Sequence, residues 1–235
     1  MAPVRLLLGL AAALALAACD RLPTTPDPVF EARVRAYLLE HPEVIEEAVQ
    51  RLNARREAEA GRAVAVALRE QRPALERDPR DFVANPNGRL TVTQFYDYRC
   101  SFCIAAAPEV LALIRQRPDV RVVFKELPLL GPTSDRAARL ALIVRRRGGD
   151  SLALYRDLTA ARPLDDAAVD RIAAAYGVAP AELSATTAGD ADHLEDVRRL
   201  AETLRIDGTP TFIVGDRLIP GADMAAVRQA LGNPA

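Results

Sequence analysis

Lysine and histidine are nearly absent from this chain of 235 residues. Lys125 is its only lysine, and His41 and His193 are its only histidines. Arginine therefore carries almost all of the positive charge. The formal net charge of −1 gives no excess of positive charge that would indicate nucleic-acid binding. A structural zinc site needs four ligands, and both histidines lie far from the cysteines in sequence. We expect no nucleic-acid partner, no zinc site and no bound cofactor, and we interpret each histidine as a surface or helix-end residue.

Long apolar runs are also missing, with one exception at the N-terminus. Residues 6–18 are apolar, end in small residues and follow the positive charge of Arg5. The run is too short to span a bilayer permanently, so we predict that residues 1–18 are a secretion signal. No later stretch approaches ~18 uninterrupted apolar residues, and the rest of the chain is expected to be soluble.

Cysteine occurs only three times, at positions 19, 100 and 103. The segment ending in Ala18-Cys19 resembles a bacterial lipoprotein box, which implies that Cys19 becomes the lipidated first residue of the mature chain. The alternative is cleavage after an Ala-x-Ala site, which leaves Cys19 as a free thiol. Because an odd exposed thiol in an exported protein invites mispairing, we favour lipidation. Asp20 resembles an inner-membrane retention signal, so we expect a lipid anchor in the inner membrane, with a soluble periplasmic protein as the alternative.

The segment after the signal is extended at first and then helical. Residues 19–28 are rich in proline and are expected to form a tether. Residues 29–75 contain a single glycine and carry an apolar stripe with helical spacing: Val34, Leu38, Ile45 and Leu52. They are too polar to form a core of their own. We therefore expect this stripe to pack on the main domain or on other copies of the chain.

The remaining elements follow the order strand, helix, strand, helical insert, strand, strand, helix. Residues 90–96 and 121–127 predict strands, and the helix between them contains Pro108, which should kink it. Such a unit places its two strands parallel. Residues 134–206 are helical in period. The turn-rich residues 73–88 mark a boundary before the first strand.

The C-terminal elements are shorter. Residues 211–214 and 217–219 predict two strands, joined by the tight-hairpin dipeptide Gly215-Asp216. A final helix is predicted over residues 222–231.

Cys100 and Cys103 form a Cys-x-x-Cys pair after a predicted strand and at the start of a predicted helix. The free N–H groups and positive dipole end of a helix start favour a negative sulfur at Cys100. We expect Cys100 to be the exposed attacking thiol and Cys103, further in, the resolving thiol. A structural disulfide across so small a loop would stabilise little. Two thiolates also suit Cu(I), so a copper-binding envelope protein stays an alternative.

A second motif, Gly208-Thr209-Pro210, precedes the strand that follows the insert. Cis peptide bonds are rare outside X–Pro sequences. Pro210 would interrupt a regular ladder and leave the backbone of Thr209 free to bind an extended substrate segment as an added strand. An ordinary loop would explain these residues in isolation. Their position downstream of a Cys-x-x-Cys favours a substrate site.

Several segments together resemble the DsbA-like periplasmic disulfide proteins. They are Phe95 to Cys103, Val123 to Pro128, Gly208 to Phe212 and Pro220 to Ala222. Within that group, Phe30 to Ala48 resembles the N-terminal helices of the suppressor-of-copper-sensitivity protein C (ScsC) branch. The resemblance implies an α/β thioredoxin fold over residues 85–231, a helical insert at about 133–206 and an N-terminal helical oligomerisation or interaction segment over 29–75.

The resemblance also implies roles for individual residues. Cys100 would be the nucleophile, and a cis Pro210 would face it, with Thr209, Ser101 and Phe102 also contacting substrate. Some relatives trimerise through the N-terminal helices and act as disulfide isomerases, and Thr209 resembles the residue found before this proline in isomerases.

Three features depart from the family pattern. Ser101-Phe102 lacks the histidine that DsbA-type oxidases carry between the cysteines. We therefore expect the Cys100–Cys103 disulfide to have a reduction potential nearer the isomerase value of about −180 mV than the DsbA value of about −120 mV. Gln94 stands where relatives usually have a buried glutamate thought to move protons at the resolving cysteine. Gly148-Gly149-Asp150 replaces an aromatic-rich stretch.

We therefore predict an exported thiol-disulfide oxidoreductase that acts on unfolded or misoxidised exported proteins. Isomerase or reductase action is favoured, which requires a membrane thiol-disulfide reductase as partner. The alternative is a dithiol oxidase recharged by a membrane oxidase. The sequence cannot separate the two, because the direction of exchange depends on potential and partner.

Overall fold

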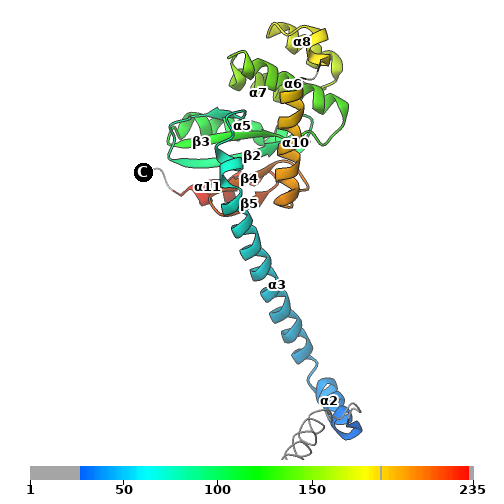
Figure 1. Ribbon diagram of the computed structural model, residues 1–235. Coiled ribbons are helices and arrows are strands. Elements are labelled where there is room, and N and C mark those ends of the chain that lie inside the picture. The colour runs from blue at the N-terminus through cyan, green and yellow to red at the C-terminus, as the bar shows by residue number, and fades with distance from the viewer. Residues whose placement is uncertain (1–26, 186, 233–235) are drawn as a thin grey trace, which may run out of the picture. The chain divides into compact units, whose positions relative to one another are not determined.

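The computed structural model describes residues 27–185 and 187–232 (Figure 1). Its chain divides into two compact units, residues 1–59 and residues 60–235. The predicted secretion signal, Cys19 and nearly all of the predicted tether lie outside the described residues. Among the helices that the structure describes, none is long and apolar enough to cross a bilayer.

The N-terminal unit is helical. Helix α2 (Pro28–Glu40) begins after Asp27, whose carboxylate accepts a hydrogen bond from the Val29 N–H at 3.0 Å. Helix α3 (Glu43–Glu70) begins in this unit. No side chain of α2 is buried, and large apolar residues of the unit are exposed, namely Val29, Phe30, Val34, Tyr37, Leu39, Ile45, Val49 and Leu52. The predicted apolar stripe is therefore present and open to solvent.

A five-stranded sheet forms the centre of the second unit, in the order β1-β3-β2-β4-β5. The strands are β1 (Phe82–Ala84), β2 (Leu90–Tyr96), β3 (Val120–Glu126), β4 (Thr211–Val214) and β5 (Arg217–Pro220). β2 and β3 are parallel, and every other pair is antiparallel. With the helices described next, this is the predicted α/β thioredoxin arrangement.

Strand β1 corrects one sequence-based interpretation. The turn-rich residues 73–88 predict only a boundary, yet Phe82–Ala84 pairs with β3 and Phe82 stacks on Phe124 at 4.9 Å between ring centroids. Turn residues frame this strand so closely that its three residues show no alternating pattern. The sheet therefore begins before residue 85.

The helices of the second unit surround the sheet. Helix α5 (Ser101–Gln116) connects β2 to β3, and α11 (Met224–Leu231) follows β5. The insert comprises α6 (Pro132–Arg146), α7 (Ser151–Ala160), α8 (Asp166–Ala175), α9 (Pro180–Ser184) and α10 (Ala188–Thr203). Figure 1 shows α6, α7 and α8 grouped at one end of the sheet and α10 alongside it. A short helix, α4 (Arg72–Glu76), precedes β1.

Each face of the sheet has its own core. One core contains residues of α5, α7 and α11 together with Tyr96 and Phe124 of the strands. The other contains residues of α10 together with Phe95, Leu68 and Leu75. Because successive strand residues point to opposite faces, neighbouring Phe95 and Tyr96 serve different cores. The end of α3 and all of α4 thus belong to the core of the second unit.

Candidate functional site

The two cysteines lie at the first turn of α5. Cys100 is the N-cap residue, in extended conformation, and Cys103 lies one turn inside the helix; both are free thiols. Cys100 is 9% exposed and Cys103 is 1% exposed. Cys100 is thus the more accessible of the two sulfurs, but the prediction that it is an exposed thiol is wrong.

The loop before β4 lies against Cys100 and accounts for its low exposure. The peptide bond between Thr209 and Pro210 is cis, and the Cys100 thiol donates a hydrogen bond to the Thr209 carbonyl oxygen at 3.0 Å. The fold thus brings together two motifs that are 109 residues apart in the chain. Pro210 itself is buried, and Thr209 is half-buried. The sequence predicts a free Thr209 carbonyl, but in the structure this carbonyl accepts a hydrogen bond from the Cys100 thiol.

Apolar side chains around this contact are open to solvent. Phe102, between the cysteines, is 65% exposed, and Leu129 and Leu130 are also exposed. The Arg99 side chain donates to the Leu130 carbonyl at 2.8 Å, which holds the loop after β3 beside the loop that carries Cys100. Exposed apolar residues around a reactive sulfur suit a substrate whose own core is not yet folded.

Asp97 organises these loops, and sequence reasoning missed it. One carboxylate oxygen accepts hydrogen bonds from the Arg99 N–H at 2.7 Å and the Ser134 hydroxyl at 2.8 Å. The other accepts from the N–H groups of Leu129 at 2.8 Å and Leu130 at 3.0 Å. The available signal was a lone carboxylate between two tyrosines, directly after the strand that leads to Cys100.

Burial affects the protonation of the Cys103 thiol. It raises the pKa of the Cys103 thiol to about 12, although hydrogen bonds from the Asp97 backbone and the Thr209 side chain act in the opposite direction. Cys103 therefore stays protonated at neutral pH, which is consistent with the predicted role of a resolving thiol.

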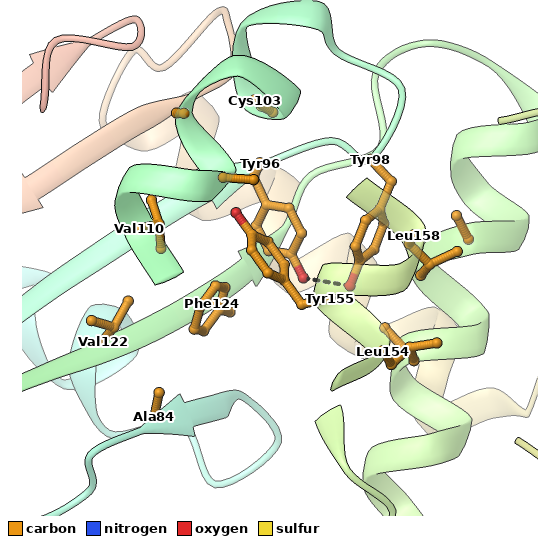
Figure 2. Packing of buried hydrophobic residues seen from close by; sticks show 14 of the residues in the cluster. Ala84, Tyr96, Tyr98, Cys103, Val110, Val122, Phe124, Leu154, Tyr155 and Leu158 are labelled. Atoms are coloured by element: carbon orange, nitrogen blue, oxygen red, sulfur yellow. Dashed lines mark hydrogen bonds between the residues drawn. The ribbon is translucent and has the colours of Figure 1, made fainter. Parts of the chain in front are cut away.

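A buried carboxyl group lies on the same side of the sheet as Cys103. Glu126 accepts a hydrogen bond from the Tyr96 hydroxyl at 3.0 Å, and the Tyr96 and Tyr98 hydroxyls are 2.9 Å apart. Figure 2 shows this tyrosine pair within the aromatic packing below α5. Removal from water raises the pKa of Glu126 to about 7.

Replacement of Glu126 by glutamine should change the pH dependence of stability. The unfolded carboxyl ionises near 4.5 and the folded one near 7, so the folded state binds the extra proton and loses stability as pH rises between these values. The wild type should lose roughly 3 kcal/mol relative to Glu126→Gln over this interval. Urea unfolding at a series of pH values measures the difference. Parallel curves for the two proteins would contradict the assignment.

The opposite face of the sheet holds a second buried polar cluster. Lys125 lies 2.6 Å from a carboxylate oxygen of Asp81, and it also donates to the Ala74 carbonyl at 2.6 Å. The His193 ring nitrogens lie 3.5 Å from Asp81 and 3.8 Å from Asp78. His193 is fully buried, and burial lowers its pKa to about 4, so the prediction of a surface or helix-end histidine was wrong for this residue.

Asp78, Asp81 and His193 are the one group of described side chains with the spacing of metal ligands. The Lys125 ammonium already supplies the positive charge beside Asp81, and Arg80 donates to Asp78. The cluster therefore fits an internal salt-bridge network that ties α10 to β3 and to the loop before β1.

Two family models match the chain. The model of the DsbA-like thioredoxin domain matches residues 91–232, and the model of the copper resistance protein ScsC N-terminal domain matches residues 30–59. The chain belongs to the DsbA-like thioredoxin family. Membership implies thiol-disulfide oxidoreductase activity, and the predicted resemblance to the ScsC branch is confirmed.

Solved structures agree with this assignment. A thioredoxin-like oxidoreductase from Silicibacter pomeroyi is 35% identical, with 68% of this chain and 95% of that chain covered and a TM-score of 0.64. Proteus mirabilis ScsC is 26% identical, with 86% and 91% covered and a TM-score of 0.64. A periplasmic thioredoxin-like protein from Salmonella enterica is 30% identical, with 68% and 95% covered and a TM-score of 0.62. No curated protein sequence matches this DsbA-like protein.

Proposed function

We propose that this DsbA-like protein is a periplasmic disulfide isomerase and reductase that acts on misoxidised exported proteins. The contact between the Cys100 sulfur and the Thr209 carbonyl, at 3.0 Å across a cis Thr209–Pro210 bond, carries the proposal. It places a nucleophile beside a backbone edge that can pair with an extended substrate. A location in the periplasm is supported by the similarity to the periplasmic thioredoxin-like protein from Salmonella enterica.

The reaction begins at Cys100. Its thiolate attacks a substrate disulfide, forms a mixed disulfide and releases one substrate sulfur as a thiolate, which takes a proton from water. In isomerisation, a substrate thiolate then displaces Cys100, and no electrons are gained or lost overall. In reduction, Cys103 attacks the Cys100 sulfur and closes the Cys100–Cys103 disulfide, which a membrane thiol-disulfide reductase must reopen with two electrons.

The residues around the pair favour this direction. The side chains of Ser101 and Phe102 carry no positive charge that would stabilise a reduced Cys100 thiolate. A less stabilised thiolate makes a less oxidising couple, so we expect a potential near about −180 mV. The exposed Phe102, Leu129 and Leu130 would contact unfolded substrate segments. The rival function, a dithiol oxidase, would use the same residues at a higher potential.

We infer that copies of the chain associate through the N-terminal unit. Apolar residues of α2 and early α3, namely Phe30, Val34, Leu38, Leu39 and Ile45, line an open groove of about 370 Å³. Association of copies, as a trimer, would cover this surface and place several Cys100 sites around one substrate. A lipid at Cys19 would hold the assembly at the inner membrane.

Reactivation of a scrambled-disulfide protein tests the proposal. The full mature chain should reactivate it, whereas Val34→Glu with Leu39→Glu should dissociate the assembly and remove most reactivation. Arg33→Glu, on the same helix, is the matched control and should behave as wild type. Oxidation of a dithiol peptide without reactivation by the full mature chain would overturn the isomerase assignment in favour of an oxidase.

A further inference from the structure

The Asp97 carboxylate is buried directly after β2, in the segment that leads to Cys100. It is 2% exposed. Its four partners are the N–H groups of Arg99, Leu129 and Leu130 and the hydroxyl of Ser134. All four donate, so the position requires an acceptor at each of two oxygens, which a carboxylate offers. An asparagine of the same shape would turn its own N–H groups toward at least one backbone N–H.

Two of these bonds decide where Leu129 and Leu130 lie. Both N–H groups point inward at one Asp97 oxygen, at 2.8 and 3.0 Å, while each leucine is 47% exposed. The Leu130 carbonyl is held as well, because the Arg99 side chain donates to it at 2.8 Å. Leu130 is thus bound at both its N–H and its C=O by residues of the segment that leads directly to Cys100.

A role in folding alone does not explain this arrangement. The N–H groups of an exposed loop can be paired by a turn within the loop or by water. Here a carboxylate 32 residues away from Leu129 in the chain pairs them instead, and it belongs to the segment of the nucleophile. The result is an exposed apolar pair, Leu129 and Leu130, at a fixed position relative to Cys100.

We propose that Asp97 is a positioning residue for substrate binding: it fixes Leu129 and Leu130 beside Cys100, where they bind apolar residues that flank a cysteine in an unfolded protein. This inference rests on the proposed function, in which the substrates are misoxidised exported proteins. Asp97 itself is buried and does not touch the substrate. Without its carboxylate, the loop would have to be ordered each time a substrate binds, and this ordering weakens binding.

The attack by Cys100 should not depend on this carboxylate. The Cys100 N–H donates to the Asp97 backbone carbonyl at 3.2 Å, and the Cys100 thiol donates to the Thr209 carbonyl at 3.0 Å. Neither contact uses the Asp97 side chain. Loss of the carboxylate should therefore weaken the binding of large unfolded substrates and leave exchange with a small disulfide unchanged.

Asp97→Ser tests the proposal in the full mature chain. The serine hydroxyl can still accept the Arg99 N–H two residues on, as in a serine turn, but it offers no second oxygen for Leu129 and Leu130. The KM for reactivation of scrambled ribonuclease should rise about tenfold, the effect of ordering two side chains, with kcat within about twofold of the wild-type value. Exchange with dithiodipyridine, a small neutral disulfide, should keep the wild-type rate.

Further variants separate positioning from folding. Leu129→Ser with Leu130→Ser changes only exposed side chains and should raise KM about as much. Adding Asp97→Ser to this pair should raise KM little further, because all three changes remove the same interaction. Arg99→Met, also exposed, releases the Leu130 carbonyl and should raise KM in the same direction. Asp223→Ser, at the N-cap of α11, is the matched control and should keep the wild-type KM.

The outcomes distinguish this role from the underlying chemistry. A wild-type KM in Asp97→Ser, or an equal loss of exchange with ribonuclease and with dithiodipyridine, would overturn the proposal. A wild-type KM in both Arg99→Met and the leucine pair would overturn it as well, even where Asp97→Ser does not fold. Failure of the wild-type protein to exchange either disulfide would overturn the proposed function itself.

Discussion

Replacement of Cys103 by serine should convert the protein into a trap for its substrate. Cys100 can still attack a substrate disulfide, but Cys103 is no longer there to resolve the intermediate. With a peptide disulfide as substrate, a one-to-one mixed disulfide therefore accumulates and reductive turnover stops. Cys100→Ser removes the sulfur that donates to the Thr209 carbonyl and should lower exchange by roughly a thousandfold or more, to the background rate. Mass spectrometry of the intact protein and insulin reduction measure the two effects.

Cys19→Ala in the same mature chain is the matched control for the Cys103 and Cys100 variants. It removes the third cysteine and should exchange disulfides at the wild-type rate. Turnover by Cys100→Ser, or a mixed disulfide that maps to Cys103 in the wild type, would contradict the assignment of the attacking sulfur.

Replacement of Lys125 by methionine should be among the most destabilising single changes in the second unit. Lys125 lies 2.6 Å from a fully buried Asp81 oxygen, and its loss leaves a carboxylate inside the protein with no compensating charge. Breaking one side of such a pair costs about 3–5 kcal/mol. Chemical denaturation at pH 8 measures the loss, because the wild-type Asp81 carboxyl, whose pKa burial raises to about 6 even beside Lys125, is then ionised.

Two further variants identify the cause. Lys125→Met combined with Asp81→Leu removes both charges and should recover most of the stability. Arg51→Met breaks an exposed ion pair with Glu47 and should cost less than about 1 kcal/mol. Equal losses in the single and double Lys125 variants would show that packing, and not the unpaired charge, is responsible.

The sequence contained the parts of the site that depend on local spacing. Cys100 and Cys103 were visible because two residues separate them at a helix start, and Pro210 because it precedes a short strand after the insert. The order of elements along the chain from residue 90 on followed from the periodicity of residues around these motifs, whereas strand β1 did not. The cis bond at Thr209 agrees with the expectation.

Other features depend on contacts between distant segments and left no local signal. His193 lies on a helix with a polar face, and only packing against Asp78 and Asp81 buries it. The Asp97 carboxylate gains its partners from Ser134 and from the loop after β3, more than thirty residues away.

Disulfide mapping after a single turnover tests the redox pair most directly. Fully reduced Cys19→Ala protein is mixed with one equivalent of a peptide disulfide, quenched in acid, alkylated and digested. Each equivalent of reduced peptide should be matched by one Cys100–Cys103 disulfide, since two electrons leave the protein for every peptide disulfide that opens. Reduced peptide accompanied by Cys100 and Cys103 that are both alkylated would contradict the assignment of these cysteines as the redox pair.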